Sequence, residues 1–138
     1  MAALIEAELR RVGFDKPAFD TIVASGPNSA VPHYRAGDRV LTAGDFVVLD
    51  FGGMFRGYAV DLTRTITMGP ASARQRRLLE HIAAAQDAGF AAVRESSPAT
   101  DIDRATRDSM TAAGLGDAFG HGTGHGLEIG RASCRERV

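Results

Sequence analysis

Apolar residues recur at helical spacing in three segments of the chain. The first segment covers residues 1–12 and is followed by Gly13, a residue type that commonly ends helices. The second covers residues 71–93, and the third covers residues 100–113, with its first or second residue as the N-cap and Gly114 as its stop. The pattern therefore predicts three amphipathic helices, one at the N-terminus and two in the second half.

Between the first two helices, the pattern changes to short β-branched and apolar runs. Residues 19–24 predict a short strand, and residues 25–29 have the composition of a turn. Residues 45–51 and 58–68 are again rich in β-branched and aromatic residues, and the glycine-rich segment 52–57 separates them. We expect these two runs to form a β-hairpin whose loop is longer than two residues.

Composition places the chain among soluble globular domains. It has 138 residues, the size of one domain, and Lys+Arg 16 against Asp+Glu 17 leaves a net charge of −1. This balance argues against a nucleic-acid binder, which needs a basic face. No apolar run approaches the roughly 20 residues of a membrane span, and the N-terminus lacks the features of a secretory signal. Cys134 is the single cysteine, which excludes a disulfide framework, so a cytoplasmic protein is expected.

Two aspartates carry the strongest chemical signal. Asp50 and Asp61 lie on the two arms of the predicted hairpin. If they are directly opposed, they project to the same face with Cβ atoms about 4.5–5.5 Å apart. Two carboxylates at that spacing repel each other unless a cation lies between them, and they suit a pair of hard divalent ions. The alternative, that both point to solvent on an exposed face, stays open from spacing alone.

Histidines supply the second signal. His121 and His125 lie four residues apart in a run where every second residue is glycine, which disfavours a helix and favours a loop or strand that another group approaches closely. Imidazole binds manganese, iron, cobalt and zinc, but a flexible loop would explain the same run. His33 lies in a turn after Pro32 and by itself would be an ordinary loop residue.

The last eleven residues, 128–138, look foreign to the rest of the chain. They lack apolar periodicity and contain the one cysteine. Residues 129–138 also match a reading frame of the reverse complement of a widely used short-read sequencing adapter, ATC GGA AGA GCG TCG TGT AGG GAA AGA GTG. We expect the natural sequence to stop at Leu127 or Glu128 and the tail to be adapter-derived. Any other codon choice in the coding DNA would overturn this hypothesis.

Taken together, these motifs resemble the M24 metallopeptidases, the "pita-bread" enzymes. The resemblance runs from about residue 4 to residue 127, so residues 1–127 are expected to be part of an M24 catalytic domain with an α+β pita-bread fold truncated at both ends. Three motifs in this order make the resemblance specific. The first is Ser25-Gly26-Pro27-Asn28 with Pro32-His33-Tyr34. The second joins Gly44-Asp45, Asp50-Phe51-Gly52, Gly57-Tyr58 and Asp61-Leu62-Thr63-Arg64-Thr65, and the third is His121-Gly122-Thr123-Gly124-His125-Gly126.

The motif around His33 looks closer to aminopeptidase P and prolidase than to methionine aminopeptidase. By resemblance, Asp50, Asp61 and His125 are metal ligands, and His33 and His121 are catalytic histidines that contact substrate or carry protons. The resemblance implies two divalent metal ions, with Mn²⁺ expected and Co²⁺, Fe²⁺ or Zn²⁺ as alternatives. It further implies a peptide substrate and hydrolysis of Xaa-Pro bonds at peptide N-termini, and it leaves open a homodimer of the full-length protein. The charge balance and the lack of a long apolar run predict no nucleic-acid or membrane partner.

Other members of the family give the alternatives. A methionine aminopeptidase or a creatinase-like hydrolase would share the fold, and a non-catalytic binding module would keep the fold without the reaction. Retention of Asp50, Asp61 and His125 argues against the binding module. The family has two further glutamate ligands and another histidine after the His125 motif, and this chain ends before them. We therefore expect the chain by itself to be inactive.

Overall fold

The computed structural model describes residues 1–126, which form two compact units, residues 1–71 and residues 72–126. The predicted adapter-derived tail, residues 128–138, lies outside the described residues. Within residues 1–126, no helix is both long and apolar enough to cross a membrane.

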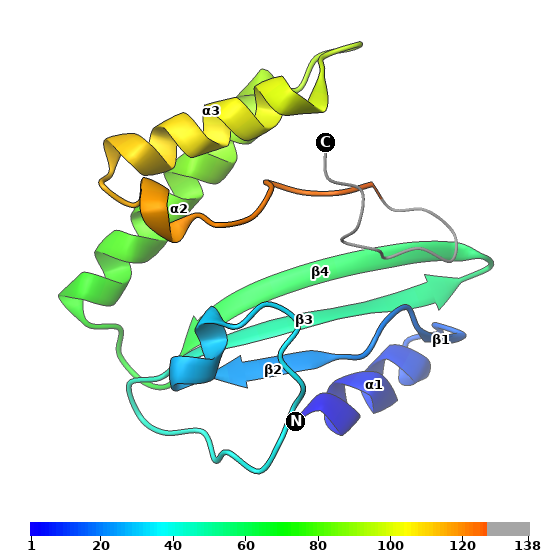
Figure 1. The fold of residues 1–138 in the computed structure, drawn as a ribbon. Helices are drawn as coiled ribbons and strands as arrows, with labels where there is room; N and C mark the ends of the chain where they lie inside the picture. Colours follow the sequence, from blue (N-terminus) through cyan, green and yellow to red (C-terminus); the bar gives the residue numbers. More distant parts are fainter. Residues whose placement is uncertain (127–138) are drawn as a thin grey trace. The chain divides into compact units, whose positions relative to one another are not determined.

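The first unit is a four-stranded antiparallel sheet with one helix beside it (Figure 1). Strand β3 is central, because β1 and β2 pair with it along one edge and β4 pairs with it along the other. Leu9, Ala24 and Val47 are its buried apolar residues. Its elements are α1 (Ala2–Arg11), β1 (Lys16–Pro17), β2 (Ile22–Ser25), the 3₁₀ helix η1 (Gly26–Ala30), β3 (Phe46–Phe55) and β4 (Tyr58–Thr67).

Helix α1 ends where the sequence predicts. Gly13 has a φ of +105°, the left-handed region that favours glycine. This turn lets the Gly13 and Phe14 amides donate to the carbonyls of Arg10 and Leu9 at 3.1 and 3.0 Å, which satisfies the end of the helix. The chain then turns toward the sheet and forms β1, a two-residue strand that the hydrophobic pattern does not predict.

The hairpin differs from the expectation in its loop. Phe55 pairs with Tyr58, so the turn is only the two residues Arg56 and Gly57, with φ values of +50° and +86°. Positive φ at both positions is the requirement of a type I′ turn, which matches the twist of the strands. The prediction of a longer loop was wrong because Gly52 and Gly53 belong to β3. A side chain at either glycine would overlap an aromatic ring, Phe19 at the first and Phe14 at the second.

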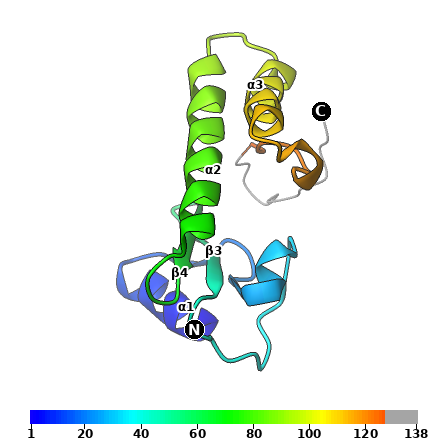
Figure 2. The same ribbon diagram turned by 90° about the vertical axis from the view of Figure 1, so that its left-hand side faces the viewer.

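The second unit is a helical hairpin. Helices α2 (Ala73–Ala92) and α3 (Ala99–Ala112) pack side by side, and the 3₁₀ helix η2 (Gly116–Ala118) follows (Figure 2). Ala85 and Met110 are its buried apolar residues. Gly89 on α2 allows the helices to approach closely, because a Cβ there would lie 2.5 Å from the Thr106 hydroxyl.

Both helices begin at positions that differ slightly from the predicted ones. Helix α2 starts after Ser72, whose hydroxyl accepts from the Gln75 amide at 3.2 Å while the Gln75 side chain accepts from the Ser72 amide at 2.9 Å. This capping box explains a start two residues later than expected. The N-cap of α3 is Pro98 and not Thr100 or Asp101, so that prediction was wrong by about half a turn. Gly114, with a φ of +73°, follows the end of α3 as expected.

Candidate metal and substrate site

The two aspartates share one face of the β3–β4 hairpin but are not directly opposed. Asp50 pairs with Thr63, and Asp61 pairs with Gly52. Directly paired residues project to the same face, and residues two apart along a strand do so as well, so Asp50, Thr63 and Asp61 lie on one face. The expected pairing of Asp50 with Asp61 was wrong because the two-residue turn shifts the register by two positions.

The observed register still suits a cation between the carboxylates. Diagonal neighbours in an antiparallel pair are typically about 7–8 Å apart, still within reach of two side chains that converge on a common ion. Both aspartates are half-buried, and the Thr63 hydroxyl donates to Asp50 Oδ1 at 2.9 Å. Hydrogen bonds of this kind orient carboxylates that bind metals. The donor set therefore fits hard divalent ions, although the metal role itself stays a prediction.

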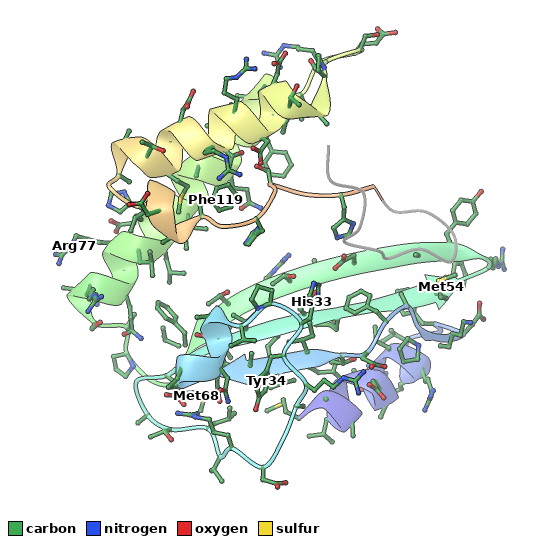
Figure 3. The ribbon with its side chains drawn as sticks, in the orientation of Figure 1. His33, Tyr34, Met54, Met68, Arg77 and Phe119 are labelled. Carbon is green, nitrogen blue, oxygen red and sulfur yellow. The ribbon has the colours of Figure 1, made fainter. Side chains whose placement is uncertain are left out.

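His33 lies on the loop after η1, in the first unit (Figure 3). Its side chain is exposed, and its φ is +60°, a value that residues other than glycine seldom adopt. Such backbone strain persists only where the surrounding structure imposes it, and it occurs often at functional sites. The conformation is consistent with the predicted catalytic role but does not assign it.

An ion pair closes the loop that carries His33. Arg39 donates to Ser25 Oγ at 2.8 Å and to Asp45 Oδ2 at 2.6 Å, which joins the end of β2 to the start of β3. The Thr42 amide donates to the same Asp45 oxygen at 3.0 Å. The Arg39 guanidinium, followed by the Thr42 amide, holds the pKa of the Asp45 carboxyl below its usual value.

The histidine–glycine run forms an extended loop after η2, as the glycines predict. His121 Nδ1 lies 2.8 Å from the Gly122 carbonyl, and His125 Nδ1 lies 3.1 Å from the Gly126 carbonyl. Because a carbonyl oxygen can only accept, each bond requires the proton on Nδ1. In the neutral imidazole the lone pair is then on Nε2, the arrangement found in many metal-binding and proton-transferring histidines.

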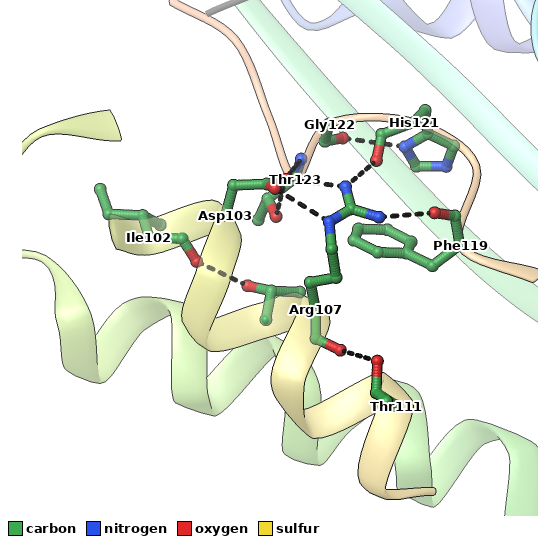
Figure 4. Close-up of polar contacts among 9 residues, drawn as sticks. Ile102, Asp103, Arg107, Thr111, Phe119, His121, Gly122 and Thr123 are labelled. Atoms are coloured by element: carbon green, nitrogen blue, oxygen red, sulfur yellow. Dashed lines mark hydrogen bonds and ion pairs between the residues drawn. The ribbon is translucent and has the colours of Figure 1, made fainter. Parts of the chain in front are cut away.

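An ion pair on α3 holds this loop, and our reading of the sequence did not identify it (Figure 4). Arg107 Nε lies 3.1 Å from Asp103 Oδ2, and Arg107 also donates to the carbonyls of Phe119 and His121 at 2.8 and 3.0 Å. Asp103 Oδ1 accepts from the Thr123 amide and hydroxyl, both at 2.9 Å. The spacing of the acid and the base, four residues apart on a predicted helix, was the available signal.

The described residues do not by themselves assemble a complete metal centre. Within residues 1–126, no three His, Cys, Asp or Glu side chains lie close enough together to hold a metal ion. Asp50 and Asp61 belong to the first unit, and His121 and His125 belong to the second. The ligand set of Asp50, Asp61 and His125 stays a prediction.

Comparison with known proteins decides the family. The model of metallopeptidase family M24 matches residues 1–133. The chain belongs to this family. The Xaa-Pro dipeptidase of Pyrococcus furiosus is 39% identical over 129 residues, which are 94% of this chain and 37% of the relative. An uncharacterized peptidase of Bacillus subtilis, YqhT, is 42% identical over 123 residues, 89% of this chain and 35% of the relative.

Solved structures of M24 proteins have the same fold. The prolidase from Pyrococcus furiosus matches with a TM-score of 0.89 at 39% identity, over 93% of this chain and 38% of that chain. The X-Pro aminopeptidase from Thermotoga maritima matches with a TM-score of 0.90 at 36% identity, over 93% of this chain and 36% of that chain. The predicted α+β pita-bread fold is confirmed, and this M24 chain spans about a third of the length of its relatives.

The family match does not decide the origin of the tail. It ends at residue 133, inside the segment 128–138 that we expect to be foreign. The coding DNA remains the test of that expectation.

Proposed function

We propose that this chain is part of an M24 peptidase that hydrolyses the bond between an N-terminal residue and proline. The observation that carries the proposal is the 39% identity, over 94% of the chain, to an Xaa-Pro dipeptidase. The placement of Asp50 and Asp61 on one face of the hairpin supports it. The names of these relatives favour this substrate class over a methionine aminopeptidase or a creatinase-like hydrolase.

Asp50, Asp61 and His125 are the proposed ligands of two divalent cations, with Mn²⁺ as the expected metal and Co²⁺, Fe²⁺ or Zn²⁺ as alternatives. Bound cations of this kind lower the pKa of a coordinated water and polarise a carbonyl. The protein's part is to orient the ligands. Thr63 holds the Asp50 carboxylate, and the Gly126 carbonyl holds His125 in the tautomer whose lone pair is on Nε2.

His33 and His121 are the proposed substrate-contacting histidines. The Gly122 carbonyl holds the proton of neutral His121 on Nδ1, so Nε2 is the atom that can accept a proton or a hydrogen bond from the substrate. His33 is exposed and has a left-handed φ of +60° on the loop that follows η1. Both histidines would position the scissile peptide and neither would bind metal in this proposal.

A chimera tests the activity. Residues 1–126 of this chain would replace the matching segment of the Pyrococcus furiosus Xaa-Pro dipeptidase, which supplies the remaining two thirds of the relative's length. We expect the chimera to hydrolyse Ala-Pro with Mn²⁺ and to lose turnover in the Asp61→Ala variant. Glu80→Ala, an exposed position on α2, is the matched control and should leave turnover unchanged.

A panel of substrates separates the alternatives. Faster cleavage of Met-Ala-Ala than of Ala-Pro would favour a methionine aminopeptidase, and hydrolysis of creatine would favour the creatinase-like alternative. Comparison of Ala-Pro with Ala-Pro-Ala distinguishes a dipeptidase from an aminopeptidase. A folded, metal-loaded chimera that cleaves none of these substrates would contradict the proposal and favour a binding module.

The role of His33 has its own test. In the chimera, His33→Ala should lower turnover by about 10²–10⁴-fold, the usual contribution of an acid–base or positioning histidine, and leave the metal content near normal. Loss of bound metal in this variant would show that His33 has the wrong assignment.

Three finer expectations belong to the same proposal. Reconstitution of the chimera with each metal in turn tests Mn²⁺ against the alternatives, and the highest turnover identifies the preferred ion. Sedimentation of the full-length protein tests the homodimer. Fractionation of the source cells tests the cytoplasmic location, which enrichment in a secreted fraction would contradict.

A further inference from the structure

We propose that the Asp103–Arg107 pair on α3 positions the histidine–glycine loop so that His121 meets the substrate. The pair is a positioning device and touches no reacting atom. This inference rests on the proposed function, because it assigns the pair a purpose through His121. Its structural basis lies entirely within the second unit (Figure 4).

The pair contacts the loop backbone on both sides of His121. Arg107 donates to the carbonyl of Phe119, two residues before it, and to the carbonyl of His121 itself. Asp103 accepts from the amide and the hydroxyl of Thr123, two residues after it. These four bonds, with the ion pair between the two side chains, fix the backbone from residue 119 to residue 123 against α3.

Ring contacts extend the same support to the imidazole. The Arg107 guanidinium carbon lies 4.7 Å from the centroid of the Phe119 ring, and Phe119 meets the His121 ring edge to face with centroids 5.1 Å apart. A continuous series of contacts therefore runs from the ion pair through the Phe119 ring to the imidazole. Together with the bond from Nδ1 to the Gly122 carbonyl, it restrains both the position and the rotation of the His121 ring.

The loop needs such support because of its composition. A Cβ built at Gly120, Gly122, Gly124 or Gly126 would meet no heavy atom within 4 Å among the described residues. Glycine has the widest backbone freedom, so a loop with these four residues samples many conformations unless other groups anchor it. His121 and Thr123 lie between these glycines, and both are bonded to the ion pair on α3. The His121 carbonyl accepts from Arg107, and the Thr123 amide donates to Asp103.

A second ion pair on the same helix provides the comparison. Asp101 and Arg104 form a bond of the same length, 3.1 Å, but their side chains are 48% and 68% exposed, against 32% and 39% for Asp103 and Arg107. An exposed pair of this kind contributes little to stability. Arg104 therefore serves as a matched control for Arg107, with the same charge and a neighbouring position on α3.

The first test is kinetic and uses the chimera. Arg107→Met and Asp103→Asn should each lower kcat for Ala-Pro by about 10²-fold, the cost of a misplacement near 1 Å, with little change in KM, metal content or melting temperature. Arg104→Met should leave kcat, KM, metal content and melting temperature unchanged. In a His121→Ala background, Arg107→Met should cause no further loss of kcat, because its effect acts through His121. A full additional loss there would overturn the proposal.

The second test needs no turnover. In Arg107→Met, the backbone amides of residues 119–123 should exchange hydrogen faster than in the parent, and those of α2 should not, as measured by mass spectrometry. The same exchange can be followed in the 138-residue chain if the chimera does not fold. If the parent chimera is inactive but the loop of Arg107→Met exchanges faster, the proposed function is refuted and the positioning role is not. Unchanged exchange in the loop would refute the positioning role.

Discussion

Replacement of Thr63 by valine tests whether the Asp50 carboxylate is held in place for a metal ion. The Thr63 hydroxyl donates to Asp50 Oδ1 at 2.9 Å, and valine removes this donor while keeping a β-branched side chain of nearly the same shape. Because Thr63 is exposed, the substitution leaves no buried cavity. The change therefore acts on the orientation of one carboxylate and little else.

The expected magnitude follows from the position of this bond. Loss of a hydrogen-bond partner to a metal ligand typically costs about 10–100-fold in metal affinity, which is about 1.4–2.7 kcal/mol. A hydrogen bond to a charged group contributes about 1.5–3 kcal/mol where water is excluded, and an exposed one contributes less. Since Thr63 is open to solvent, we expect the lower end of the range, a loss of about tenfold.

Calorimetric titration of the metal-free chimera with Mn²⁺ measures this loss. Thr65→Val is the matched control, because Thr65 lies two residues along the same face of β4 and pairs with Val48 instead of an aspartate. Thr63→Ser, which keeps the hydroxyl, should bind nearly as well as the parent. Equal affinity in the two valine variants would refute the reasoning, as would a loss in Thr63→Ser as large as that in Thr63→Val.

Three further predictions follow from other parts of the chain. Gly53→Ala should destabilise the folded chain by about 1–3 kcal/mol in urea unfolding because its Cβ would overlap the Phe14 ring, whereas Gly122→Ala, which has open space, should not. The Arg39–Asp45 pair lowers the pKa of the carboxyl, so its stabilisation is complete above the ordinary aspartate pKa of about 3.9 and is lost as the pH falls through the lower folded value. An Asp45→Asn variant should therefore unfold with a flatter acid limb, and an unchanged limb would contradict the assignment. The 138-residue chain alone should not hydrolyse Ala-Pro in excess Mn²⁺, and turnover that depends on a predicted ligand would refute this expectation.

The sequence alone predicted those features of the structure that depend on residues close together along the chain. Helix α1 ends at Arg11, two residues before a glycine, because the left-handed conformation of Gly13 lets the Phe14 amide reach the Leu9 carbonyl. The β-branched runs on either side of Gly52 and Gly53 indicated two strands, and the aspartates and histidines indicated a metallopeptidase through their order along the chain. Each of these inferences depends either on residues a few positions apart or on the order of motifs along the chain.

Tertiary contacts decided the register of the hairpin and the support of the histidine loop. Gly52 and Gly53 have the composition of a loop, yet they extend β3, at positions where a side chain has no space: the Val60 carbonyl and the Phe19 ring fill it at Gly52, and the Phe14 ring fills it at Gly53. That extension shortens the turn and makes Asp50 and Asp61 diagonal neighbours. Asp103 and Arg107 look like an ordinary helical ion pair until the loop folds back onto α3. Such contacts join residues distant in sequence, and local patterns carry no information about which of them form.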